Sequence, residues 1–253
     1  MRMHLLSGGR LRMRRSVYVP DAERGETIDL PVSCALVRHA RGNVLFDTGC
    51  HPSVVTDAQA RWGTMAKAMV PIGDATENVV DELARIGLAP GDVDVVVCSH
   101  FHPDHCGCNA FFPRSTVFCH RLELEAASAD DALAKGYLQQ EWNHGLRRVA
   151  VDGEHDLLGD GRLVLKPLPG HTPGMLGALV HLDRDGSFVL ASDAVPLALT
   201  LERDALPRNT ADPDAASRSL DEVRRMQASG VTVVYGHDAQ QWATLRTGSA
   251  FYE

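Results

Sequence analysis

The chain has 253 residues, of which 44% are hydrophobic and 23% charged, a composition that fits a folded globular protein and excludes bulk disorder. Its formal net charge of −8 argues against a nucleic-acid partner, because proteins that bind nucleic acids usually present a basic face. No stretch approaches the ~20 apolar residues that span a membrane, and residues 1–18 lack the apolar core of a secretory signal. We therefore expect a cytoplasmic protein with no membrane partner, whose six cysteines are free thiols.

The first hundred residues predict β-strands and one helix. The arginines between residues 10 and 15 predict a short basic hairpin. Residues 33–38 and 43–47 are apolar runs separated by Ala40-Arg41-Gly42, a pattern typical of a β-hairpin. From Asn78 to Ile86 apolar residues recur at helical spacing, and glycine and proline then end the helix. The helix leads into residues 93–98, a short apolar strand.

A dense group of histidines and one aspartate follows this strand. The run from Ser99 to His105 contains His100, His102, Asp104 and His105, and Pro103 fits the first turn of a new helix. Further along the chain, three β-rich segments (163–168, 187–192 and 231–235) are followed by His171, Asp193 and His237. A helix from Pro213, capped by Asp212, separates the last two. Side chains at the ends of neighbouring strands converge, so we expect one site and two facing sheets with helices outside.

The seven residues suit a pair of divalent metal ions. Imidazole and carboxylate groups are the ligands that zinc and related ions accept. His100 and His102 can face one way on an extended segment, whereas the adjacent Asp104 and His105 must diverge, so the motif can serve two metals. Asp193 is the natural bridge between them. A closed structural zinc site is disfavoured because such sites are usually cysteine-rich, and Cys106-Gly107-Cys108 lacks the spacing of one.

The sequence resembles the metallo-β-lactamase fold superfamily and, within it, the N-acyl-homoserine lactone lactonases. The likeness spans nearly the whole chain, and its motifs are Asp47-Thr48-Gly49, Ser99 to Gly107, Pro169 to Gly174, Ser192-Asp193-Ala194 and Tyr235 to Asp238. The resemblance implies an α/β (α+β) protein with a four-layer αβ/βα sandwich, formed as one hydrolase domain over residues 1–253. It also implies two divalent metal ions, with Zn²⁺ expected: His100, His102 and His171 bind one, Asp104, His105 and His237 bind the other, and Asp193 bridges them. Asp47 would orient a ligand histidine.

The resemblance predicts a dinuclear zinc hydrolase that opens a small lactone by metal-bound hydroxide, with Asp104 and Asp193 as catalytic carboxylates. Some segments also resemble the pyridoxolactone-hydrolysing relatives, so the lactone stays open. The alternative is a thioester or ester hydrolase of the hydroxyacylglutathione hydrolase type. A non-catalytic protein with this fold and a nuclease are further readings, which the complete ligand set and the acidic charge disfavour. No organic cofactor is implied, and a homodimer is left open.

One residue departs from the lactonase pattern. These enzymes commonly carry a tyrosine three positions after the bridging aspartate, where this chain has Pro196. None of the tyrosines at 18, 137, 235 and 252 can be assigned that role from the sequence. We expect a donor from residues 129–145, Tyr137 or His144, to reach the open face of the metal pair.

Residues 51–75 and 129–145 are the segments expected to set the substrate specificity. The first contains Trp62, Met65 and Met69, which either line an apolar pocket or belong to an amphipathic helix seated on the core.

Overall fold

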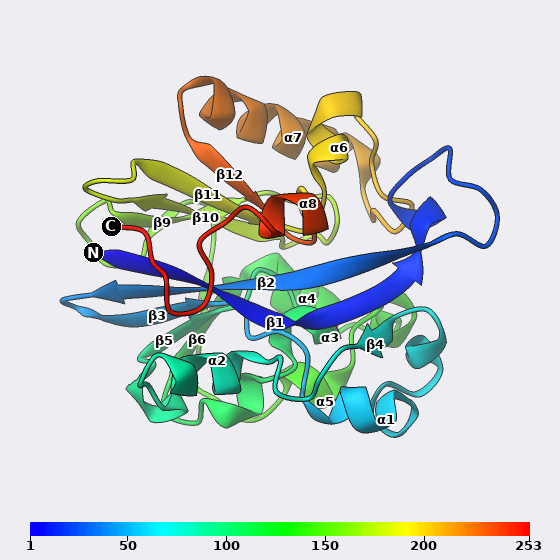
Figure 1. The fold of residues 1–253 in the computed structure, drawn as a ribbon, viewed down its shortest axis with the longest axis horizontal. Coiled ribbons are helices and arrows are strands. Elements are labelled where there is room, and N and C mark those ends of the chain that lie inside the picture. The colour runs from blue at the N-terminus through cyan, green and yellow to red at the C-terminus, as the bar shows by residue number, and fades with distance from the viewer.

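A computed structural model describes residues 1–253, and it shows two β-sheets facing each other with helices on both outer sides (Figure 1). The larger sheet has the strand order β4-β1-β2-β3-β5-β6-β7. Its strands are β1 (Arg2–Arg14), β2 (Thr27–His39), β3 (Gly42–Phe46), β4 (Val70–Ile72), β5 (Val95–Val97), β6 (Thr116–His120) and β7 (Arg148–Val151). The smaller sheet has the order β12-β11-β10-β9-β8, with β8 (His155–Asp156), β9 (Leu163–Pro167), β10 (Leu176–His181), β11 (Ser187–Ser192) and β12 (Thr232–Tyr235).

The helices divide between the two outer sides in chain order. The larger sheet is flanked by α1 (Ser53–Trp62), α2 (Val79–Arg85), α3 (Pro103–Cys106), α4 (Arg121–Ala127) and α5 (Gln139–Trp142). The smaller sheet is flanked by α6 (Ala198–Arg203) and α7 (Pro213–Ala228), and α8 (Ala239–Trp242) lies near the C-terminus (Figure 1). The predicted four-layer αβ/βα sandwich is confirmed.

Neighbouring residues of the larger sheet enter different apolar cores. In β5, Val96 packs among the residues beneath the helices, whereas Val97 packs in the cluster between the two sheets. Leu6 and Leu5 of β1 divide in the same way. Because successive side chains of a strand point to opposite faces, a sheet buried on both faces needs apolar residues at every position. This explains why apolar and polar residues do not alternate in β5.

The predicted hairpin and helices are confirmed, with their expected end signals. β2 and β3 pair antiparallel. The Asn78 side chain accepts the amide protons of residues 80 and 81 at the start of α2, and Asp212 accepts that of Ala215 in α7. The basic hairpin is also present as β1 and β2, and Arg12 forms a two-point ion pair with Asp29 across it. All six cysteines are buried free thiols.

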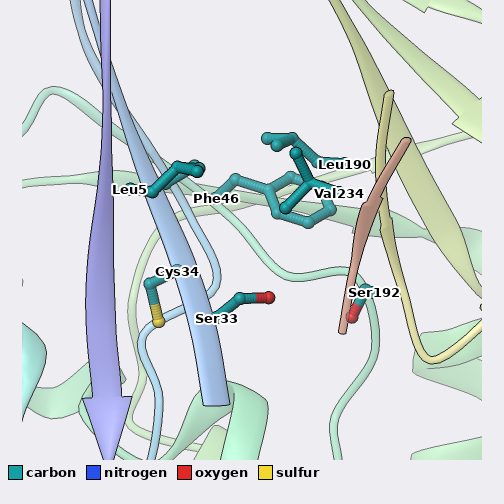
Figure 2. A pocket seen from close by; sticks show the side chains of 8 residues that line it. Leu5, Ser33, Cys34, Phe46, Leu190, Ser192 and Val234 are labelled. Carbon is teal, nitrogen blue, oxygen red and sulfur yellow. The ribbon is translucent and has the colours of Figure 1, made fainter. Parts of the chain in front are cut away.

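Between the sheets lies a small cavity next to the end of β11. Leu5, Phe46, Leu190 and Val234 form its apolar wall, and Ser33 and Ser192 lie at one end (Figure 2). The cavity has about 10 Å³ of room for the centre of a water molecule, about enough for one water. This cavity is therefore too small to admit a substrate. No helix of the protein combines the length and apolar character needed to cross a membrane.

Candidate metal centre

The structure brings all seven predicted ligand residues together where the strands end. Residues 99–105 follow β5, and His171, Asp193 and His237 follow β9, β11 and β12. Ligand atoms lie within 4.8 Å of one another in three sets: His100, His102 and His171; Asp104, His105 and His237; and His100, His105 and Asp193. The first two sets share no residue, and the third combines Asp193 with one histidine from each of them. Six of the seven side chains are buried.

The first set has three ring nitrogens that point at one another. Nδ1 of His102 lies 3.1 Å from Nε2 of His100 and 3.0 Å from Nε2 of His171. The other nitrogen of His102, Nε2, lies 3.0 Å from the carbonyl oxygen of Lys135. A carbonyl can only accept, so Nε2 carries the proton and Nδ1 presents a lone pair to the other two rings. A cation among these nitrogens would satisfy all three.

Asp193 directs its two oxygens to different sets. Oδ1 lies 2.8 Å from Nε2 of His237 and 3.3 Å from Nε2 of His105, whereas Oδ2 lies 3.3 Å from Nε2 of His171. Oδ1 of Asp193, Nε2 of His105 and Nε2 of His237 are buried without a well-formed hydrogen bond. Buried polar atoms are rarely left in this state. The donor set therefore fits two cations with a carboxylate between them.

Hydrogen bonds from outside fix the rings so that their free nitrogens face the centre. Oδ2 of Asp47 accepts from Nδ1 of His105 at 2.9 Å and from Oγ of Ser99 at 2.8 Å. Oγ of Ser99 in turn lies 2.9 Å from Nδ1 of His100. The carbonyl oxygen of Pro31 accepts from Nδ1 of His237 at 2.8 Å. The expectation that Asp47 orients a ligand histidine is met twice, once directly and once through Ser99.

Comparison with known proteins identifies the family of the chain. The family model described as "Metallo-beta-lactamase superfamily" matches residues 27–237. The chain belongs to this superfamily. It is 31% identical to the N-acyl homoserine lactonase AttM of Azorhizobium caulinodans over 100% of this chain and 99% of that one. It is 34% identical to the N-acyl homoserine lactonase AiiB of Agrobacterium fabrum over 89% of this chain and 86% of the other.

A solved structure extends the likeness to the fold. An N-acyl homoserine lactone hydrolase, solved with the product N-hexanoyl-L-homoserine at its catalytic metal centre, superposes with a TM-score of 0.89. It is 25% identical and covers 99% of this chain and 98% of its own. The predicted resemblance to the superfamily and to its lactonase group is confirmed.

The buried charges of this metallo-β-lactamase site shift one another's protonation. Burial is the largest influence on Asp193 and opposes its ionisation, yet the imidazoles of His237, His105 and His171 hold its pKa well below the usual range. Burial also opposes protonation of His105, but the carboxylates of Asp104 and Asp193 raise its pKa well above 6.5. Burial and the neighbouring rings lower the pKa of His171 to about 4. Burial opposes protonation of His237 too, but Asp193 raises its pKa, so without a cation His105 and His237 together offset the two carboxylates.

Nothing in the sequence indicates a role for Glu123, whose side chain connects two loops of the site. Its side chain is fully buried in α4 and accepts the amide protons of Phe101 at 3.0 Å and Gly174 at 3.1 Å. The first amide belongs to the loop with His100 and His102, and the second to the loop with His171. Because both loops are hydrogen-bonded to the same carboxylate, Glu123 sets the distance between them. One of two glutamates in a short helix gives no signal for this role.

The segment 129–145 contacts the site through Tyr137 and Lys135. The ring of Tyr137 lies 5.3 Å from that of His102, and its hydroxyl lies beside Glu123 and Thr172. Nε2 of His144 lies 2.9 Å from the carbonyl oxygen of Glu141. The polar group of His144 is thus directed to another partner, whereas the hydroxyl of Tyr137 is buried without a well-formed hydrogen bond, so the expectation of a donor stays a prediction for Tyr137 alone. The segment also acts through the carbonyl of Lys135, which orients His102.

Trp62 belongs to an apolar cluster beside the site, not to an open pocket wall. It is 2% exposed and its Nε1 donates to Oε1 of Glu141 at 3.1 Å. The cluster also contains Tyr18, Leu138 and Leu197, with Met65 and Met69 packed against it. The interpretation of α1 as a helix seated on the core is therefore the better one for Trp62.

Proposed function

We propose that the protein is a dinuclear metal-dependent hydrolase that opens the ester bond of a small lactone, an N-acyl-homoserine lactone or a related γ-lactone. The observation that carries the proposal is Asp193, whose two oxygens face two separate groups of ligand atoms. Support for the substrate class comes from the relatives, which are named N-acyl homoserine lactonases and match the chain over nearly its full length. We also propose that residues 1–253 form one hydrolase domain.

We assign His100, His102 and His171 to one metal ion, and Asp104, His105 and His237 to the other, with Asp193 between them. The orphaned atoms of His105, Asp193 and His237 support this assignment. All donors are nitrogen or oxygen, a set that Zn²⁺ accepts readily, and we propose zinc for both sites. When bound, such a pair supplies Lewis-acid polarisation of a carbonyl and lowers the pKa of a water molecule.

The chain's own residues prepare this chemistry in three ways. Hydrogen bonds donated by the ligand rings to Asp47, Pro31 and Lys135 lock the rings, so little reorganisation is needed during reaction. Burial of the ligands excludes bulk water, which strengthens electrostatic interactions with developing charge. Asp104, a buried carboxylate 3.8 Å from Nε2 of His237, can accept the proton of the attacking water and return it to the product.

The proposal is tested with purified protein, stripped with a chelator and then reloaded with Zn²⁺. The substrates are N-hexanoyl-homoserine lactone, γ-butyrolactone, a glutathione thioester and a phosphodiester. We expect two metal ions per chain and lactone hydrolysis that is lost on stripping and regained on reloading. Turnover of the thioester alone would favour the hydroxyacylglutathione hydrolase alternative, and turnover of no lactone would refute the proposal.

A matched pair of variants tests the ligand assignment. His102→Ala removes a proposed ligand and should lower both metal content and turnover. His181→Ala removes a histidine outside the site, whose Nδ1 contacts Oγ of Ser187, and should change neither. Equal metal content in the two variants would contradict the assignment. Size-exclusion chromatography of the same samples tests whether the protein forms the homodimer that we propose as its assembly.

A further inference from the structure

Opening a lactone ring places negative charge on the ring oxygen, and Pro196 offers that oxygen no hydrogen bond. Its carbonyl oxygen accepts the amide proton of His237 at 2.9 Å, and a proline has no side-chain donor. Another hydroxyl donor near the site is Tyr18. The inference that follows rests on the proposed lactonase function.

Tyr18 reaches the site from the connection between β1 and β2. It follows a short 3-10 turn (Arg15–Val17), and its ring centroid lies 6.5 Å from that of His237 in an edge-on arrangement. It also packs in the same apolar cluster as Leu197, the neighbour of Pro196. The side chain is 3% exposed, comparable to the 5% and 6% of Asp104 and Asp193. Tyr18 is therefore as buried as these two carboxylates.

The backbone around Tyr18 is held in place from two sides. The amide of Tyr18 donates to the carbonyl oxygen of Arg15 at 3.0 Å. The carbonyl oxygen of Val17 accepts the amide proton of Arg208 at 2.8 Å, which ties this turn to the segment after α6. A side chain on such a fixed backbone is preorganised, so its hydroxyl can act without a cost in ordering.

The hydroxyl of Tyr18 has no strong acceptor in the protein. Its one partner is the thioether sulfur of Met13 at 3.3 Å, and sulfur of this kind is a weak acceptor. A phenol has an ordinary pKa of ~10 and is neutral at pH 7, so the hydroxyl can donate a hydrogen bond. A buried hydroxyl with so weak a partner costs free energy, and an oxygen of a bound ligand would recover it.

We propose that Tyr18 is a catalytic residue that donates a hydrogen bond to the ring oxygen as the lactone opens. The bond between the acyl carbon and the ring oxygen breaks, and the electron pair stays on that oxygen. A water oxygen forms the new bond to the acyl carbon, and a proton from the same water ends on the product hydroxyl. Tyr18 keeps its own proton throughout and leaves the cycle unchanged.

The test is Tyr18→Phe, which removes the hydroxyl and keeps the ring in its cluster. We expect kcat for N-hexanoyl-homoserine lactone to fall by about 10- to 100-fold, somewhat less than the loss of one donor to a developing oxyanion costs in other enzymes. For the matching thiolactone the loss should be smaller, because a thiolate, with a thiol pKa near ~8.5, needs less help to leave than an alkoxide. Metal content should stay at the wild-type value.

A binding measurement supplies a readout that does not depend on turnover. The ring-opened product N-hexanoyl-L-homoserine carries the new hydroxyl, so calorimetry should show weaker binding of it to metal-loaded Tyr18→Phe than to wild type. Tyr252→Phe is the matched control, because it removes another buried tyrosine hydroxyl, one that accepts the amide proton of Arg246. We expect the control to keep the wild-type ratio of lactone to thiolactone turnover.

The outcomes separate this inference from the proposed function. If wild type opens no lactone, the proposed function fails. If wild type is active and Tyr18→Phe keeps its rate, its lactone-to-thiolactone ratio and its product affinity, the role of Tyr18 is refuted alone. An equal loss on both substrates together with lost metal would mean that Tyr18 only packs against the site, which also overturns the proposal.

Discussion

Gly136 controls the orientation of His102 in a way that one methyl group can disturb. The residue has φ +94°, and a Cβ there would lie 3.0 Å from Nε2 of His102, the nitrogen that donates to Lys135. The ring in Gly136→Ala must shift by a few tenths of an ångström, away from its contacts of 3.0–3.1 Å with the other two histidines. Loss of such an outer hydrogen bond typically weakens metal binding 10- to 100-fold, or roughly 1.4–2.7 kcal/mol.

The same segment offers a matched control. Gly145 also has positive φ, at +67°, but a Cβ there would meet no atom within 4 Å. Both alanine variants therefore carry the strain of the left-handed conformation, about 1–2 kcal/mol, and only Gly136→Ala touches His102. Urea unfolding of the metal-free proteins measures the strain, and competition with a chelating dye measures the affinity for Zn²⁺. Equal zinc affinities for the two variants would refute the role given to Gly136 and Lys135.

Three further predictions concern other parts of the site and its surroundings. Asp193→Ala should lose most of the bound metal and the hydrolytic activity, and retention of two metal ions per chain would contradict the bridging role. Glu123→Gln should lower the free energy of unfolding by about 1–3 kcal/mol, because one of two buried amide donors loses its acceptor, whereas the exposed Glu125→Gln should change it little; urea unfolding compares the two. Nδ1 of His51 accepts from the amide of Ser53, and burial lowers the pKa of His51 to about 4. As the pH falls, His51 is protonated in the unfolded chain before it is protonated in the folded one. The free energy of unfolding should therefore fall as the pH drops from about 6.5 to about 4, and more steeply in wild type than in His51→Asn.

The elements that position the site could be predicted because their signals are local. An apolar run that ends in a ligand residue marks a strand end, as for β5 before His100 and β11 before Asp193. Helix caps are equally local, and Asn78 and Asp212 make the hydrogen bonds that their residue types predict. The dense motif from His100 to His105 needs no tertiary information to suggest a metal. The residue sets of the two predicted sites coincide with two of the observed clusters.

The residues that support the ligands could not be predicted, because their role depends on distant contacts. Glu123 and Glu125 are two residues apart in α4, yet one is fully buried beneath the ligand loops and the other is exposed. Only the packing of α4 against those loops decides between them. Tyr18 lies more than two hundred residues from His237 in the chain, and no pattern in the sequence links the two. The hydroxyl of Tyr137 lies beside Glu123 and is buried without a well-formed hydrogen bond, a position that its neighbours in the sequence do not indicate.

The site also joins the two sheets, which couples metal binding to the packing of the fold. Asp47 follows β3 of the larger sheet and Ser192 ends β11 of the smaller one, and both have positive φ, at 58° and 45°. Such conformations cost about 1–3 kcal/mol each and persist only where other contacts hold them. Here Oγ of Ser192 donates to Oδ2 of Asp47 at 3.2 Å and lies 2.9 Å from Oγ of Ser99. The network that orients His100 and His105 is thus the same one that ties the sheets together. A cation that fixes those histidines should therefore raise the stability of the whole sandwich, and its loss should loosen the sheets at this edge first.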